Sequence, residues 1–537
     1  MSVLTIFVSV LTYSRAMSDY DAIVIGAGHN GLTAAFLLQN AGLRTVCLEA
    51  NTYAGGMAAT VELIDGFRYE IAGSVQFPTP AVVAKELGLD GLPTIETDVM
   101  SVNLGDDGDE PMIFYRDPMK FMTHLGEKHG NDAVMGMAGL LTWSQGPAKA
   151  LGRFDVRTPP KTIDEMYACA SNEAERRAIH DVLFGTAMDA IDRYLPDRSK
   201  HAVLRSMLAF LAINSTYRGP YTPGSATCLA FALAVPDDTT AMMTKLEGGI
   251  GALCDHLLEQ FLAAGGEIKY RTKVDSIVVA DDRIAGVRLR DGSQIKAPIV
   301  VSTLSPDTTL LDMVGAERLP ADLASRLTGR DHRASFVQIH FALDGLPTFA
   351  PPYDFLNEPG MQGSIGMFNS PEEQQRQWEE CRRGVIPDNP SMGMQIPSVH
   401  DAEMAPEGKH AASVYAYAFP VETDREQHGH LKNVMAEKVV DKICRYAPDF
   451  RDIQIRHITF APYHMNTMFG APSGDFCHGL LHPDLMGPNR PGPTGFLDLP
   501  VPIDGLYLGG AGCHGGPGIT FIPGYNAAHQ VIDDRVS

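Results

Sequence analysis

The sequence predicts an α/β fold in which one domain is inserted into another. Near the amino terminus, a glycine-rich loop lies between a short apolar strand and a segment with helical periodicity. A mainly helical region follows from residue 80 to about residue 241, after which strand patterns return. A proline-rich segment then leads to a last strand, a second glycine-rich loop and a last helix. An open parallel sheet whose strands are separated by inserted segments accounts for these observations.

The first strand–helix–strand unit carries the strongest motif. Residues 20–25 form the predicted strand, a helix extends to about Asn40, and a second strand follows at residues 44–48. The loop at residues 26–31 reads Gly-Ala-Gly-His-Asn-Gly. This is the GxGxxG pattern of a dinucleotide-binding fold, in the strand–loop–helix context that such a fold requires.

Each glycine of this loop has its own function in such a fold. Gly26 permits the tight turn after the strand, Gly28 lets the backbone approach a pyrophosphate, and Gly31 lets the helix pack closely on the strand. The helix amino terminus directs free N–H groups at the phosphates. Glu49 ends the second strand, near the spacing of about 20 residues at which an acidic side chain accepts hydrogen bonds from the ribose.

Gly55 and Gly56 favour FAD over NAD as the dinucleotide. A glycine pair shortly after the acidic residue resembles the extension of flavoproteins, in which the chain continues beside the pyrophosphate toward the flavin. NAD dehydrogenases do not require such a pair. We therefore expect FAD as the cofactor.

A second GxGxxG pattern occurs at residues 510–515, again after a predicted strand. Too few residues follow it for a helix, a second strand and an acidic residue about 20 residues on. Pro517 and Pro523 also interrupt the start of any helix there. We interpret residues 510–518, the closing loop, as a segment that passes close to the bound flavin, with the final helix directed at it.

The remaining patterns outline the rest of both domains. Helices are expected at residues 202–213, 252–264, 371–383 and 525–533, and strands at 267–270, 274–279, 284–289, 299–302, 336–343 and 505–508. Asp291 and Gly292 form an expected hairpin turn. Five prolines between residues 486 and 502 predict an extended linker that returns the chain to the first domain.

Composition and charge exclude several classes of function. The 45% apolar and 20% charged residues are typical of a globular protein, and the net charge is −22. Such a charge repels phosphate backbones, so we expect no nucleic-acid partner, and it argues against a polybasic membrane anchor. Eight cysteines include no Cys-x-x-Cys pair, which excludes a zinc knuckle and a thioredoxin-like dithiol, and we expect no metal site. Free thiols favour the cytoplasm or another reducing compartment.

The first residues of the chain have two interpretations. Residues 2–13 are mostly apolar, but they lack the basic segment that precedes the apolar part of a secretory signal. Twelve residues are also too few to span a bilayer, which needs about 20. Either Met17 begins the domain after an upstream start codon, or this segment makes a peripheral contact with a membrane surface or a partner. Self-association into a homo-oligomer is a further open alternative.

Several segments together resemble one flavoprotein family. Residues 20–60 look like the amino-terminal motif of the phytoene-desaturase-like FAD-dependent oxidoreductases. Within that family, the likeness is closest to the branch of pyridine nucleotide-disulphide oxidoreductase domain-containing protein 2, followed by carotene ketolases. The other matching segments are Thr222-Pro-Gly-Ser225, Glu247-Gly-Gly-Ile-Gly251, Val300-Val-Ser302, Ala405-Pro-Glu-Gly-Lys-His410, Phe476-Cys-His-Gly479 and Leu506-Tyr-Leu-Gly-Gly-Ala-Gly-Cys-His-Gly515. The disulfide chemistry in the branch's name is not expected here, because the chain has no Cys-x-x-Cys.

The motifs and the resemblance together give a domain assignment. We expect a Rossmann-type, glutathione-reductase-like FAD-binding domain from residues 17–80, 242–330 and 495–537, with an α+β substrate domain inserted at 81–241 and 331–494. The expected cofactor-binding residues are Gly26, Gly28, Asn30, Gly31, Glu49, Gly55, Gly56, Met57, Val274, Gly512, Gly518 and Ile519.

His514 is the candidate catalytic residue. It lies in the closing loop, and an imidazole is well matched to acid–base chemistry at neutral pH. The alternative is a loop histidine that bonds a backbone carbonyl. His478 is a weaker candidate for the same role, and Cys513 has no partner thiol, so a packing role is expected for it.

The expected reaction is hydride transfer from an apolar substrate to the flavin, which converts a C–C bond into a C=C bond in an isoprenoid or carotenoid-like molecule. Because one nucleotide site is expected, oxygen or a quinone is the expected electron acceptor. The alternatives are an amine oxidase, an isomerase, and a regulatory protein in which FAD is structural. Against an amine oxidase, Met57 stands where many of them have arginine, and the closing loop lacks their aromatic cage.

Overall fold

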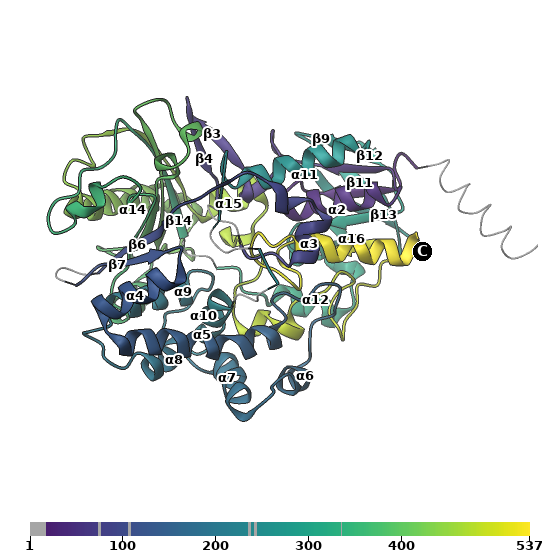
Figure 1. Cartoon of the computed structure of the whole chain (residues 1–537). Helices are drawn as coiled ribbons and strands as arrows, with labels where there is room; N and C mark the ends of the chain where they lie inside the picture. Colours follow the sequence, from purple (N-terminus) through teal and green to yellow (C-terminus); the bar gives the residue numbers. More distant parts are fainter. Residues whose placement is uncertain are drawn as a thin grey trace, which may run out of the picture.

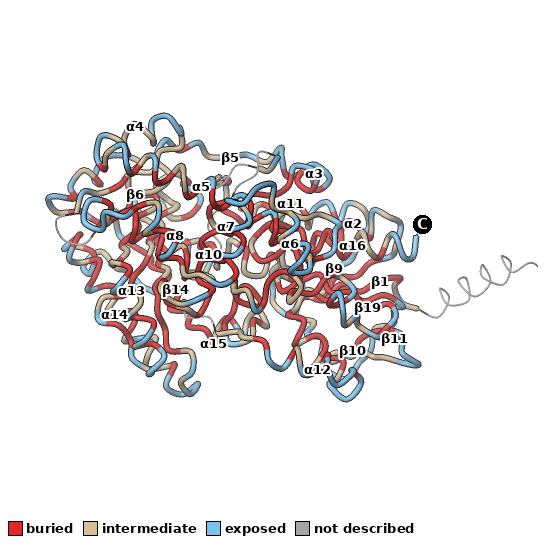
Figure 2. Tube along the Cα trace, turned by 90° about the horizontal axis from the view of Figure 1, so that it is seen from below, coloured by how far each residue is buried: buried red, intermediate tan, exposed pale blue. Residues whose placement is uncertain are grey.

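The computed structural model describes residues 18–72, 77–105, 109–234, 238–240, 244–333 and 336–536 (Figure 1). It contains a five-stranded parallel sheet and a seven-stranded mixed sheet, each covered by helices. Figure 2 shows that the buried parts of the chain run through both sheets, whereas exposed residues are frequent on outer helices such as α14 (Arg425–Tyr446). No helix in the described part of the chain combines the length and apolar character that a membrane crossing requires.

The parallel sheet has the strand order β19-β13-β1-β2-β9. These strands are Leu506–Leu508, Ile299–Ser302, Ala22–Ile25, Thr45–Leu48 and Glu267–Lys269. Four of them are buried along their whole length, which explains why they are continuous apolar runs without alternation. The strands thus come from three distant parts of the chain, as the sequence predicts.

Different layers cover the two faces of this sheet. On one face, α2 (His29–Asn40), α11 (Gly251–Ala263) and α16 (Ile522–Arg535) share an apolar core with it. On the other face lie the antiparallel strands β10 (Val274–Ala280), β11 (Arg283–Leu289) and β12 (Gln294–Ile295), with α12 (Ala321–Thr328) and the turn of π-helix Thr308–Gly315. The expected hairpin at Asp291–Gly292 connects β11 and β12. This is the expected Rossmann-type arrangement.

The mixed sheet has the order β18-β14-β17-β16-β15-β6-β7. Its strands are Gln454–Phe460, Phe336–Leu343, His410–Tyr417, Ser391–Gln395, Ser364–Met367, Val99–Leu104 and Met112–Tyr115. The strand β14 forms where the alternation predicts it. Its odd-numbered residues pack in one core with α14, and α13 (Pro371–Cys381) and α15 (Pro462–Phe469) complete this half.

The interpretation of residues 80–241 as mainly helical is wrong at its beginning. The strands β6 and β7 lie there, and β6 pairs in parallel with β15, more than 200 residues later. The pairing partner of β6 decides its conformation, and no local pattern reveals that partner. The hairpin of β3 (Thr60–Ile64) and β4 (Phe67–Glu70) and the short pair β5 (Thr94–Ile95) and β8 (Lys245–Leu246) were likewise not predicted.

The rest of that region is a helical layer with its own apolar core. After α3 (Ala81–Glu86) it comprises α4 (Pro118–His129), α5 (Asn131–Leu151), α6 (Ile163–Ala168), α7 (Glu173–Phe184), α8 (Ala187–Tyr194), α9 (Ala202–Ile213) and α10 (Ser225–Leu233). In Figure 1 this layer lies below the mixed sheet.

The proline-rich segment returns the chain to the parallel sheet, as expected. Its backbone is irregular rather than fully extended, with a 3-10 turn at Gly487–Asn489. Phe496, Leu499 and Val501 pack in the core beneath the parallel sheet. From there the chain enters β19.

Gly31 is required by packing within the fold. A Cβ atom at this position would lie 1.9 Å from the Gly26 carbonyl oxygen. We therefore expect Gly31→Ala to lower the free energy of unfolding by about 3 kcal/mol or to prevent folding. Gly429 in α14 is the control, because nothing lies within 4 Å of its added Cβ and alanine favours a helix. Urea unfolding measures both variants, and an unchanged midpoint for Gly31→Ala would contradict this packing.

Candidate cofactor and active site

The phosphate loop leaves space beside Gly28. This residue precedes α2 with extended backbone angles (φ −69°, ψ 174°), and no side chain caps the helix there. An added Cβ would meet nothing closer than the Gly55 carbonyl oxygen at 4.0 Å. The fold itself therefore does not require glycine at 28, in contrast to Gly31. Glycine at this position leaves room for a ligand that approaches the backbone and accepts hydrogen bonds from the free N–H groups of the helix, as a pyrophosphate does.

Glu49 is held beside this loop at the end of β2. Its side chain is buried, and it accepts hydrogen bonds from the backbone N–H groups of Ala27 (2.8 Å) and Asn51 (2.7 Å). These two bonds orient the carboxylate and leave further lone pairs for ribose hydroxyls. The carboxylate, as an acceptor of hydrogen bonds from hydroxyl groups, therefore fits the ribose of a dinucleotide.

The glycine pair lies directly against the phosphate loop. Gly55 donates from its N–H to the Ala27 carbonyl oxygen (2.7 Å) and forms a parallel bridge with Gly28. Gly55 and Gly56 have φ of +99° and +57°, which favours glycine at both positions. Met57 follows in a 3-10 turn and packs against an apolar cluster outside the loop.

The amino ends of α2 and α16 meet beside the loop. Gly524 donates from its N–H to the Asn30 side-chain oxygen (3.2 Å), and a Cβ at 524 would lie 2.1 Å from the Asn30 carbonyl oxygen. The His29 ring packs edge-on against Phe521 with centroids 5.6 Å apart. Burial lowers the pKa of His29 to about 4, against the opposing effect of a hydrogen bond to the Gly518 backbone. The phosphate loop and the closing loop are therefore in contact.

The closing loop packs tightly against its neighbours. A Cβ on Gly510 would lie 2.3 Å from the Thr303 carbonyl oxygen, and one on Gly512 would lie 2.6 Å from that of His478. Gly518 has φ +108°, and Ile519 is buried in the helix-side core. The proximity of this loop to the flavin itself stays a prediction.

The predicted cofactor residues converge at one edge of the parallel sheet. The phosphate loop follows β1, Glu49 follows β2 and the closing loop follows β19, so all lie at carboxyl ends of parallel strands. Val274 begins β10 close by, since Thr272 donates from its N–H to the Glu49 carbonyl oxygen (2.8 Å). This is the edge at which open α/β sheets bind their ligands.

His514 faces the helical layer. Its ring is buried, and Nε2 lies 3.8 Å from a carboxylate oxygen of Asp155, just after α5. Burial opposes ionisation of Asp155, but contacts with His514 and Lys161 outweigh it and lower its pKa. The sequence identified His514 but gave no sign of this carboxylate. Its catalytic role stays a prediction.

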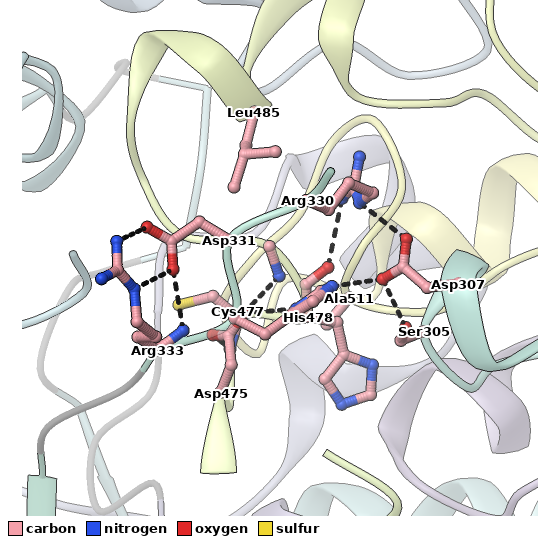
Figure 3. Close-up of polar contacts among 12 residues, drawn as sticks. Ser305, Asp307, Arg330, Asp331, Arg333, Asp475, Cys477, His478, Leu485 and Ala511 are labelled. Atoms are coloured by element: carbon pink, nitrogen blue, oxygen red, sulfur yellow. Dashed lines mark hydrogen bonds and ion pairs between the residues drawn. The ribbon is translucent and has the colours of Figure 1, made fainter. Parts of the chain in front are cut away.

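A buried charged network next to the closing loop was not predicted (Figure 3). His332 contacts Asp307 through Nε2 and Asp475 through Nδ1 (3.0 Å). Burial opposes protonation of His332, but the two carboxylates outweigh it and raise its pKa to about 9. Arg330 pairs with Asp307 at 3.1 Å. Arg330, His332 and Asp475 lie in irregular segments and Asp307 lies at the start of a short helix, so no pattern in the sequence brings them together.

The cysteines offer no redox pair. All eight are free, and burial raises the pKa of Cys513 to about 11. No group of three or more His, Cys, Asp or Glu side chains among the described residues is arranged to hold a metal ion.

The parallel sheet, the open phosphate loop with its ribose carboxylate, and the closing loop define the class of FAD-dependent oxidoreductases with a separate substrate domain. The profile of the family described as flavin containing amine oxidoreductase matches residues 31–530, and the chain belongs to this family. This confirms FAD as the cofactor and the phytoene-desaturase-like resemblance.

Relatives match along nearly the whole chain. The mouse pyridine nucleotide-disulfide oxidoreductase domain-containing protein 2 is 28% identical, over 97% of this chain and 94% of its own length. A prolycopene isomerase from Daucus carota is 23% identical, over 96% of this chain and 80% of its own length. A lycopene-forming phytoene desaturase from Pseudescherichia vulneris is 25% identical, over 93% of this chain and 95% of its own length.

Solved structures share the fold. An oxidoreductase from Methanosarcina mazei has a TM-score of 0.58 at 15% identity, covering 95% of this chain and 99% of that one. Putrescine oxidase bound to putrescine has a TM-score of 0.57 at 14% identity, covering 96% of this chain and 99% of that one. At these identities the likeness concerns the fold alone.

Gly28→Val should abolish FAD retention while the protein stays folded, because its Cβ would enter the space for the pyrophosphate, with the Gly55 carbonyl oxygen at 4.0 Å as the nearest protein atom. Glu49→Ala should weaken binding less, by about 1.5–3 kcal/mol for lost hydrogen bonds to a charged group. Release of bound flavin by heat, with identification as FAD, and circular dichroism measure both properties. A folded, fully yellow Gly28→Val variant would show that the pyrophosphate lies elsewhere.

Proposed function

We propose that the protein oxidises a C–C bond of an apolar, isoprenoid or carotenoid-like substrate to C=C. The observation that carries this proposal is the similarity, over more than nine-tenths of the chain, to proteins named for carotenoids and terpenes. These are the phytoene desaturase, the prolycopene isomerase, and one subunit of the limonene dehydrogenase from Castellaniella defragrans, which is 25% identical over 96% of this chain and 94% of its own length.

When bound, FAD would supply the acceptor for a hydride, which carries both electrons of the oxidation. The chain's own residues hold the cofactor and prepare the site. Gly28 gives the pyrophosphate room, and the amino end of α2 offers it N–H donors. Glu49, oriented by its two backbone hydrogen bonds, would hold the ribose through its carboxylate. The proton that leaves the carbon next to the hydride donor needs an acceptor, and His514 is proposed for that role.

Aromatic side chains between the helical layer and the mixed sheet support an apolar substrate. Phe210 stacks on Phe368 with centroids 4.3 Å apart, and Phe336 contacts Phe476 at 6.1 Å. Phe336, Phe476 and Leu480 line a cavity of about 10 Å³ between these two parts, together with the polar residues Asn214, Ser215, Thr216 and Asp475 and with Cys477. Burial of apolar surface against such rings supplies binding energy for a hydrocarbon.

An amine oxidase is the second candidate, favoured by the family description and by the putrescine oxidase fold. Against it, residues 510–518 contain no aromatic residue, and Met57 replaces the arginine of many amine oxidases. An isomerase, for which FAD would undergo no net redox change, is favoured by the prolycopene isomerase relatives. Oxygen or a quinone is the proposed acceptor, and the free thiols support a reducing compartment such as the cytoplasm.

Anaerobic flavin bleaching separates these candidates. We expect phytoene or limonene, delivered in detergent micelles, to bleach the visible flavin band in the dark, because hydride transfer reduces the flavin without light or oxygen. Putrescine and benzylamine should leave the band unchanged. A stopped-flow spectrophotometer measures the rate, and the product is identified by mass two hydrogens below the substrate.

Bleaching by an amine and not by any hydrocarbon would contradict the proposal and support the second candidate. Conversion of a cis-polyene to its trans isomer without loss of hydrogen would contradict it in favour of an isomerase.

A further inference from the structure

His478 is a buried histidine whose ring binds nothing in the described protein. The residue is 5% exposed, and neither ring nitrogen has a hydrogen-bond partner. In Figure 3, no dashed line reaches its ring, although the charged network surrounds its backbone. Its φ of +50° lies in the left-handed region, which non-glycine residues seldom occupy. A buried polar group without a partner carries a free-energy cost that calls for an explanation.

The backbone around His478 is held on both sides by charged groups. The Asp475 carboxylate accepts hydrogen bonds from the N–H groups of Cys477 (2.9 Å) and Gly479 (2.5 Å). Arg330 donates to the His478 carbonyl oxygen at 3.3 Å. Arg490 donates to the carbonyl oxygens of Cys477 and Gly479 at 2.7 and 2.9 Å. Four peptide groups are thus fixed around a side chain that is left free.

The same network connects this turn to the end of β13. Asp475 also contacts His332, and His332 contacts Asp307, which lies shortly after that strand. The network therefore sets the position of His478 relative to the parallel sheet.

His478 also lies next to both segments that converge at the cofactor edge. Its carbonyl oxygen would be 2.6 Å, and its Cβ 3.2 Å, from a Cβ built on Gly512 of the closing loop. It is close enough to His29 of the phosphate loop for the two rings to affect each other's charge. His29 differs from it, because the His29 ring has a hydrogen-bond partner in the Asn30 side chain (3.1 Å). Of these two histidines, His478 is the one left for a ligand.

Another histidine shows that missing partners alone are insufficient. His428 in α14 is equally buried, and both of its ring nitrogens also lack hydrogen-bond partners. Its ring lies between Phe419 and Tyr463, with centroids 5.2 and 5.7 Å away, so it serves as a packing residue. His478 has no such aromatic contact among the described residues, and it lies at the cofactor edge.

We propose that His478 is a cofactor-binding residue whose imidazole forms a hydrogen bond with a polar atom of bound FAD, and that Asp475, His332 and Asp307 position it. An imidazole can form a hydrogen bond with any of three kinds of FAD atom: phosphate oxygens, ribityl hydroxyls and flavin carbonyls. Burial lowers the pKa of His478 to about 4, so at neutral pH its ring offers one donor and one acceptor. This inference is independent of the substrate, and its test measures binding rather than turnover.

The test compares His478→Asn with His428→Asn. Asparagine tolerates a positive φ, and its side chain is too short to reach the atom that the imidazole would contact. Apo-protein of each variant is titrated with FAD by flavin fluorescence, and the absorption spectrum of the bound flavin is recorded. We expect His478→Asn to raise the FAD dissociation constant about 10-fold or more and to shift the flavin band, because one buried hydrogen bond is lost. His428→Asn should change neither.

If His478→Asn does not fold, His478→Gly carries the same test, because glycine accepts this φ without strain. Added free imidazole should then restore the FAD affinity of His478→Gly. No such restoration is expected if the role of His478 is purely structural. An unchanged dissociation constant and spectrum in the folded variant would overturn the proposal, as would equal losses in His478→Asn and His428→Asn.

Discussion

The buried guanidinium of Arg490 holds the last loop of the chain in position. The side chain is 1% exposed, and it donates to carbonyl oxygens on both sides: Cys477 and Gly479 on one segment, and Ala511 (2.5 Å) and Cys513 (3.1 Å) on the closing loop. A buried guanidinium is costly unless its donors are satisfied, and burial lowers its pKa to about 10. The planar guanidinium connects two irregular segments that are not joined by a ladder of backbone hydrogen bonds.

The geometry of the cofactor edge depends on this connection. The closing loop leads into α16, whose amino end meets α2 through Gly524 and Asn30. The other partner of Arg490 is the turn of His478, which Asp475 also braces. Arg490 thus fixes the position of the closing loop relative to the turn of His478. The parallel sheet fixes the position of the closing loop relative to the phosphate loop. Under the proposed function, FAD and the apolar substrate would meet at this junction.

Local patterns predicted the parallel sheet well, because its causes are local. The apolar runs of β1, β2 and β13 are strands buried on both faces, and the contrast of Gly31 with Gly28 follows from helix–strand packing and ligand approach. The strand β6 could not be predicted, because β15, its partner, is remote in sequence.

The network of Arg490, Asp307 and His332 was also beyond sequence reasoning. Buried polar groups in irregular segments follow no period, and only the folded chain shows which carbonyl or carboxylate each one meets. For the same reason, the sequence could not show that Nε2 of His514 lies 3.8 Å from an Asp155 carboxylate oxygen, or that the ring of His478 has no hydrogen-bond partner among the described residues.

Hydrogen–deuterium exchange of Arg490→Lys tests the role of this guanidinium most directly. Lysine keeps the charge but cannot form the planar set of bonds to both segments. Peptides that cover residues 509–520 should exchange faster than in the wild type, while peptides of β14 keep their protection. Arg451→Lys is the control, since the ion pairs that Arg451 makes with Glu437 and Asp441 are exposed. Unchanged protection of residues 509–520 in Arg490→Lys would show that the closing loop is held by other contacts and would contradict this account.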